Sequence, residues 1–239
     1  MAKSTFAGKS TDDTIRNYAE MLIDDLNSNF HENAFNQWDK AREMDNKTAK
    51  KIFGEEYSDR IGEAFSNCIT KYQIPELKAV WEKHWETRRG IRPPPSAGAA
   101  AFSDAATSRY MAQGRAWMDE SKRVVAIAEE MVESKFESIV GIVNAGLSIA
   151  PQNADLNASA AWVYVNQMST TDIPIGDKNQ PRSEWQNKGG LYQIGNLSKM
   201  EAMFAKIEPI VKGLVSRALD IQPNHPKALE AKEKITKTL

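Results

Sequence analysis

The sequence predicts an all-α protein with two helical subdomains. In segment after segment, apolar residues recur at intervals of three and four, which is the spacing of one face of an α-helix. No segment alternates apolar and polar residues for long enough to form a strand. Of the 239 residues, 41% are hydrophobic and 26% are charged, a composition that favours a folded core over a disordered chain.

Four helices are expected in an N-terminal subdomain at residues 11–92, after a leader at residues 1–10. Ser10 precedes Asp12 and Asp13, a signal typical of a helix start. Pro75 suits the first turn of the fourth helix, and Gly90 ends it. The apolar stripes of the four helices lie at residues 15–26, 34–41, 57–72 and 77–85.

A Pro/Ala-rich hinge at residues 93–103 separates this part from a C-terminal helical subdomain at residues 104–239. Its run of three prolines stiffens an extended segment. Pro209 interrupts one apolar stripe without changing its phase, which favours a kinked but continuous helix. The polar loop at residues 169–196 is longer than an ordinary connection. Helices are expected at residues 104–117, 121–149, 157–168 and 200–218, and after residue 226.

Two stretches of the C-terminal subdomain share a skeleton, "GLSIAPQNAD" and "ALDIQPNHPK". Small and apolar residues precede each proline at the spacing of a tetratricopeptide repeat, so this half of the chain resembles TPR-like antiparallel helical hairpins. The two skeletons lie farther apart than one repeat of about 34 residues, so the loop at 169–196 would be an insertion between paired helices. A generic helical bundle is the alternative. The resemblance implies hairpin packing by Val143, Gly146, Pro151, Ala161, Tyr164, Val215, Ala218 and Pro223.

No catalytic residue, cofactor site or metal site is predicted, and the chain is not expected to be an enzyme. The three histidines are isolated from one another, and a single cysteine, Cys68, excludes an intramolecular disulfide. The stretch "AGKST" lacks the earlier glycine of a phosphate-binding loop. A net charge of −1 gives no general attraction to nucleic acid or membranes. With no apolar run long enough for a membrane span or a signal peptide, we expect a cytoplasmic protein.

One cluster carries a nucleic-acid hypothesis. Trp81 and Trp85 are one helical turn apart and are followed by Arg88, Arg89 and Arg92, which combines rings that stack on bases with cations that bind phosphates. The favoured interpretation is that the tryptophans belong to the core and the arginines cover them.

Two functions follow from these observations. The first is a non-enzymatic helical interaction or scaffold protein, which binds a protein partner or another copy of itself through a helical groove. The alternative is a self-assembling, RNA-coating protein of the viral nucleocapsid or coat type.

Overall fold

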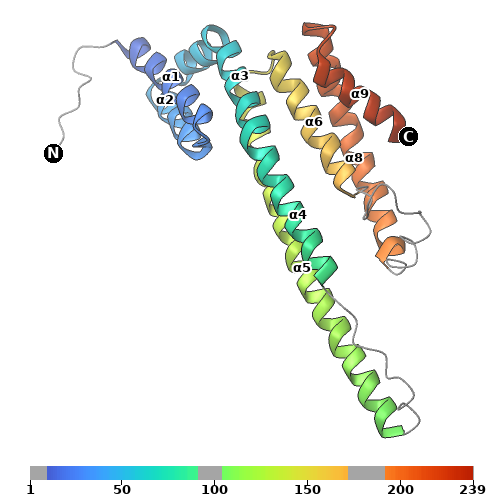
Figure 1. The fold of residues 1–239 in the computed structure, drawn as a ribbon. Helices are drawn as coiled ribbons and strands as arrows, with labels where there is room; N and C mark the ends of the chain where they lie inside the picture. The colour runs from blue at the N-terminus through green and yellow to red at the C-terminus, as the bar shows by residue number, and fades with distance from the viewer. Residues whose placement is uncertain (1–9, 91–103, 172–191, 239) are drawn as a thin grey trace, which may run out of the picture. The chain divides into compact units, whose positions relative to one another are not determined.

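A computed structural model of the chain describes residues 10–90, 104–171 and 192–238, and in these residues it contains helices and no strand (Figure 1). The expected all-α class is therefore confirmed. The hinge at residues 93–103 and most of the polar loop lie outside the described residues, as do residues 1–9 of the leader. The elements are α1 (Thr11–Asn27), α2 (His31–Lys51), the π-helical segment η1 (Ile52–Glu56), α3 (Ser58–Cys68), the π-helical segment η2 (Ile69–Gln73), α4 (Ile74–Gly90), α5 (Asp104–Ile149), α6 (Ala154–Thr171), α8 (Tyr192–Ile221) and α9 (Pro226–Thr238).

The chain forms two compact units. One unit comprises Met1–Ile74 together with Ile139–Leu239, and the other comprises Pro75–Ser138. The first unit thus holds α1 to α3, the last turns of α5, and the helices α6, α8 and α9. The second holds nearly all of α4 and most of α5.

In the first unit, α1 packs against α2 and α3 through the apolar stripe that the sequence indicated. Ile15, Leu22 and Leu26 are completely buried. The side chain of Ser10 accepts a hydrogen bond from the backbone N–H of Asp13 at 3.1 Å, so the expected helix cap is present. This cap fixes the start of α1.

Farther along the first unit, α6 packs against α3, α8 and α9. Ala158 of α6, Ala218 of α8 and Ala228 of α9 form one completely buried cluster. Side chains this small let three helix backbones approach closely. Pro209 lies inside α8, which continues past it as expected.

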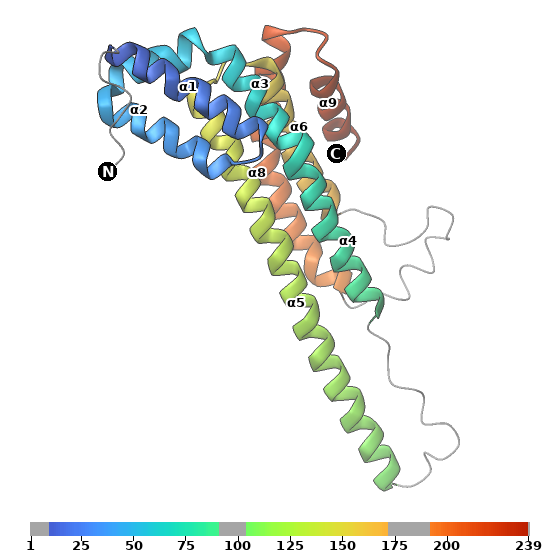
Figure 2. The same ribbon diagram turned by 60° about the vertical axis from the view of Figure 1, so that its left-hand side comes forward.

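The second unit consists of most of α4 and most of α5 (Figure 1 and Figure 2). Leu77 of α4 is buried, as are Val125 and Phe136 of α5. An ion pair between Lys135 and Glu76 joins the two helices.

Two helix breaks that the sequence suggested are absent. The segments expected at residues 104–117 and 121–149 form the single helix α5, because none of the residues between them is a strong helix breaker. At Pro75 the backbone stays helical from α3 through η2 into α4. Proline has no N–H to donate, and a π-helical turn accommodates the altered bonding. In this turn the hydroxyl of Thr70 donates to the carbonyl oxygen of Ser66 at 2.8 Å.

Candidate functional site

The residues expected to pack the helical hairpins fall into two groups. Helices α5 and α8 end at Ile149 and Ile221, each two residues before its proline. Pro151 and Pro223 are exposed in the turns that follow. The buried group consists of Val143, Gly146, Ala161, Tyr164, Val215 and Ala218.

Gly146 shows why a small residue is needed at its position. A β-carbon there would lie 2.9 Å from Cγ of Phe65 and 3.2 Å from Cδ2 of Leu156. Such distances are shorter than van der Waals contact between carbon atoms. The end of α5 therefore lies closely against α3 and α6.

The two turns after these helices have the same hydrogen bonds. The N–H of Ala150 donates to the carbonyl oxygen of Gly146, and the N–H of Gln222 donates in the same way to Ala218. Two residues after each proline, a side chain caps the next helix. Asn153 accepts from the N–H of Leu156 at 2.8 Å, and His225 accepts through Nδ1 from the N–H of Ala228 at 3.4 Å. The shared skeleton in the sequence therefore corresponds to one corner structure that occurs twice.

Polar contacts join the second corner to α6. Nε2 of the buried His225 lies 2.8 Å from Oδ1 of Asp155. Because Nδ1 accepts from the backbone, Nε2 carries the proton and donates to this carboxylate. Nε of Arg217 donates to Oδ1 of Asn157 at 3.2 Å. These bonds hold α6, α8 and α9 in a fixed arrangement.

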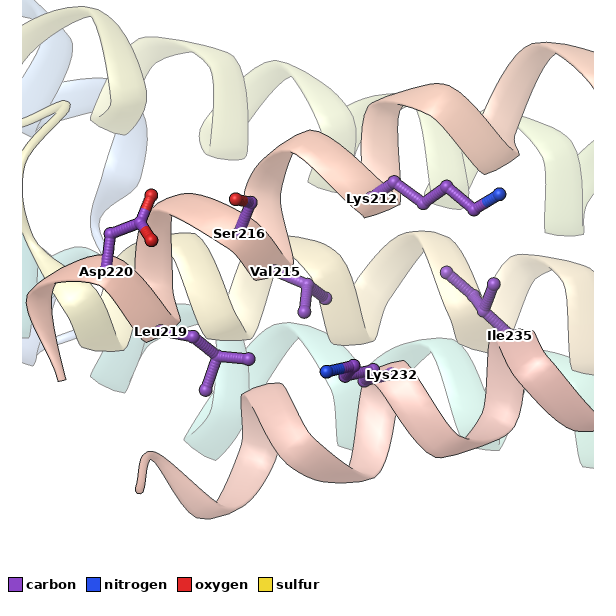
Figure 3. A pocket seen from close by; sticks show the side chains of 7 residues that line it. All are labelled: Lys212, Val215, Ser216, Leu219, Asp220, Lys232 and Ile235. Carbon is purple, nitrogen blue, oxygen red and sulfur yellow. The ribbon is translucent and has the colours of Figure 1, made fainter. Parts of the chain in front are cut away.

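A groove of about 380 Å³ lies between α8 and α9 (Figure 3). Its floor is apolar: Val215 and Ile235 are 6% and 5% exposed, and Leu219 is half-buried. Figure 3 shows Val215 and Leu219 pointing from α8 toward α9, whereas Ser216 and Asp220 point away from it. The lining residues are Lys212, Val215, Ser216, Leu219 and Asp220 from α8, and Lys232 and Ile235 from α9.

Lysines from both helices border this groove. Lys212 pairs with Glu208 on its own helix. No ion pair joins Lys232 or Asp220 to another of the described residues. An apolar floor beside ammonium groups suits a polypeptide segment that carries both apolar side chains and carboxylates.

The described residues contain no group of three or more His, Cys, Asp or Glu side chains that could hold a metal ion. The one hydroxyl that lines the groove, Ser216, is exposed.

The tryptophan and arginine cluster of the nucleic-acid hypothesis stays a prediction. Trp81, Trp85, Arg88 and Arg89 belong to α4, but their side chains lie outside the described residues. Arg92 lies outside them altogether.

The sequence pattern found the buried side of this region but missed the rim of the groove. A usable signal was present in the differences between the two repeated skeletons. Counted from Pro151 and Pro223, Lys212 corresponds to Val140, and Lys232 corresponds to Ala160. The first corner has no charged residue at either position, so the corner structure itself does not require these lysines.

No protein family, curated protein or solved structure matches this chain. None of the described helices is both long enough and apolar enough to span a membrane.

Proposed function

We propose that this chain is a non-enzymatic helical interaction protein that holds a segment of a partner protein in the groove between α8 and α9. The observation that carries the proposal is the apolar floor of this groove, formed by Val215, Leu219 and Ile235 and bordered by lysines on both helices. Apolar surface between two helices provides the contact area for a partner segment, and the charged rim provides selectivity.

The groove is suited to this role because its walls are fixed before a partner arrives. Ala218 and Ala228 are completely buried against α6, and His225 caps α9 while it bonds to Asp155. A preformed site avoids the conformational entropy that would be lost if two mobile helices had to be ordered on binding.

The rim provides a second argument. Lys212, Ser216, Asp220 and Lys232 are all exposed, so none of them is needed to fill the core. Charged side chains around an apolar centre contribute to the rate and selectivity of association more than to the folding of the protein that carries them.

Site-specific photo-crosslinking in the native host tests the proposal. A photoreactive amino acid replaces Ser216 at the rim, and in a matched control it replaces Ser148, which is exposed on α5 and does not line the groove. We expect a discrete adduct from position 216 only, and we expect Lys232→Glu to reduce it. The proposal is wrong if position 216 gives no adduct, or if both positions give the same adducts.

A further inference from the structure

We infer that the first part of α5, residues 104–124, pairs with the same segment of a second copy of this chain, with the two helices antiparallel. The pairing surface is an apolar stripe on α5 that passes through Met111, Met118 and Val125, which follow one another at seven-residue intervals. None of these residues lines the groove of the proposed function, so the two proposals are independent.

The stripe is buried in one part of α5 and exposed in the other. Val125 and Phe136 are each 7% exposed, and beside Phe136 an ion pair from Lys135 joins α5 to α4. Met118 and Met111, one and two heptads before Val125, are 46% and 57% exposed. An apolar stripe that keeps its period beyond its buried part is typical of a surface that another helix covers.

Two polar atoms on the exposed part of the stripe also favour a contact with another chain. Nε1 of Trp117 and Oγ of Ser121, one helical turn apart, are both buried, and neither forms a hydrogen bond with any described residue. A buried polar atom without a partner destabilises the structure that contains it. A helix packed on this stripe would bring polar groups to both atoms.

The exposed stripe is chemically symmetric about Gly114, which makes it complementary to itself. The pairs of stripe residues at equal distances before and after Gly114 are Thr107 and Ser121, Tyr110 and Met118, and Met111 and Trp117. An antiparallel two-fold arrangement centred on Gly114 places the members of each pair opposite each other. Hydroxyl then meets hydroxyl, and each methionine meets an aromatic ring, which is a favourable contact. A surface that fits itself indicates a second copy as its partner, because a two-fold contact uses the same surface on both chains.

Gly114 allows the close approach that such a crossing needs. A β-carbon at this position would meet no atom within 4 Å, so packing within one chain does not require a glycine here. In a helix interior, glycine is less favourable than alanine. Opposite a second Gly114, its missing side chain lets the two helix backbones approach closely.

The length of the exposed stripe determines the direction of the pairing. Helix α5 begins at Asp104, ten residues before Gly114, and the buried Val125 lies eleven residues after Gly114. An antiparallel partner centred on Gly114 therefore ends just before the buried part begins. A parallel partner would continue past Val125 onto a surface that is already buried.

The association should be weak and should stop at the dimer. Each chain contributes four large side chains, those of Tyr110, Met111, Trp117 and Met118, which bury less than the roughly 800 Å² per partner of a standard interface. A two-fold contact is closed, since neither chain has a second such surface to offer. We therefore expect a reversible equilibrium between monomer and dimer.

Sedimentation velocity on the full-length protein tests this inference. The wild type should form dimers, and no larger species, as its concentration rises. Met118→Glu should weaken dimerisation at least about tenfold, because it places an unpaired charge in the interface. Ile127→Glu is the matched control, since Ile127 is 47% exposed but lies nine residues, or about two and a half turns, from Met118 and so faces the opposite side of α5. This control should dimerise like the wild type.

Gly114→Leu tests the crossing point. A side chain at this position has free space within one chain, so far-UV circular dichroism should show undiminished helix content. It would separate the two backbones in the dimer, so dimerisation should again weaken at least about tenfold.

Cysteine crosslinking tests the direction of pairing. Arg115 and Lys122 are both exposed and lie one heptad apart on the same edge of the stripe. With the two-fold axis at Gly114, the two copies of residue 115 lie about 3 Å apart along the helix axis, and the two copies of residue 122 about 24 Å apart. A short bifunctional thiol reagent should therefore link Arg115→Cys chains into dimers and leave Lys122→Cys chains unlinked. The buried Cys68 is present in both variants, and the wild type shows its background.

Three results would overturn the inference. The first is a wild type that stays monomeric at every concentration. The second is an equal effect of Met118→Glu and Ile127→Glu on dimerisation. The third is a crosslinking pattern other than the expected one: links from both cysteine positions would indicate parallel helices, and links from neither would place the contact elsewhere.

Discussion

Replacing Gly62 with alanine tests the close contact between α3 and α6. A β-carbon at Gly62 would lie 2.3 Å from Cγ, 2.4 Å from Cβ and 2.6 Å from Nδ2 of Asn153. Asn153 cannot simply rotate away, since its Oδ1 accepts from the N–H of Leu156 at 2.8 Å and its Nδ2 donates to the carbonyl oxygen of Asp59 at 3.2 Å. The methyl group therefore forces either the helices apart or the cap of α6 out of place.

The expected loss combines opposing terms. Overpacking at a tight contact costs about 1–3 kcal/mol, and loss of a helix cap costs about 1 kcal/mol. The higher helix propensity of alanine returns about 1 kcal/mol. We expect Gly62→Ala to lower the free energy of unfolding by about 1–3 kcal/mol, as measured by urea denaturation followed by circular dichroism.

Gly141→Ala is the matched control, because no atom lies within 4 Å of a β-carbon at this exposed helical position. It should stabilise the protein by about 0.5–1 kcal/mol. Asn153→Ala should cost less in the Gly62→Ala background than in the wild type, since both changes affect the same contact. Equal stability of Gly62→Ala and Gly141→Ala would refute the close packing of α3 on α6.

Three further predictions use the same measurements or simple binding assays. Ala218→Trp should destabilise the protein by about 1–3 kcal/mol or more through overpacking, because Ala218 is completely buried. Ala205→Trp, at an exposed position, should change stability by less than about 0.5 kcal/mol. Similar melting temperatures of these two variants would contradict the assigned packing. The hydrogen bond from Arg60 lowers the pKa of Glu20 below its usual 4.5. Above pH 4.5 the pair should therefore add up to about 1 kcal/mol to the free energy of unfolding, and this contribution should be lost as the pH falls through the lowered pKa. Arg60→Gln should remove this acid sensitivity, and an unchanged pH dependence of stability would count against the pair. If Arg88, Arg89 and Arg92 bind RNA phosphates, changing all three to alanine should flatten the log–log salt dependence of binding by about 0.7 per lost contact; an unchanged slope would exclude them as the contacts.

The sequence predicted most helices of this fold because the relevant information is local. The residues that line one face of a helix recur every three or four positions, and end signals such as Ser10 and Gly90 lie beside the helices that they bound. The predictions that failed concern where one helix ends and the next begins. The helix continues past Pro75 through the π-helical turn η2, and no periodic pattern in the sequence records such a turn.

The groove was harder to predict because it depends on how two helices pair. Lys212 and Lys232 come to one groove only because α9 turns back along α8 after the corner at Pro223. An exposed lysine has no periodic signal of its own, since water accommodates it on any helix face. Val215 and Ala218 were found because their burial follows the pattern of the helix and the shared skeleton.

The repeated corner shows where such a signal can be sought. Asn153 and His225 perform the same capping role with different chemical groups, so a search by residue type does not align them, whereas their distance from the two prolines does. With this alignment, the corner's apolar positions keep their character, since Val215 and Leu219 correspond to Val143 and Leu147. Packing thus explains the residues that the two corners share. It does not explain Lys212 and Lys232, which stand where the first corner has uncharged residues, and photo-crosslinking from Ser216 with the Lys232→Glu variant tests whether this charged rim serves binding.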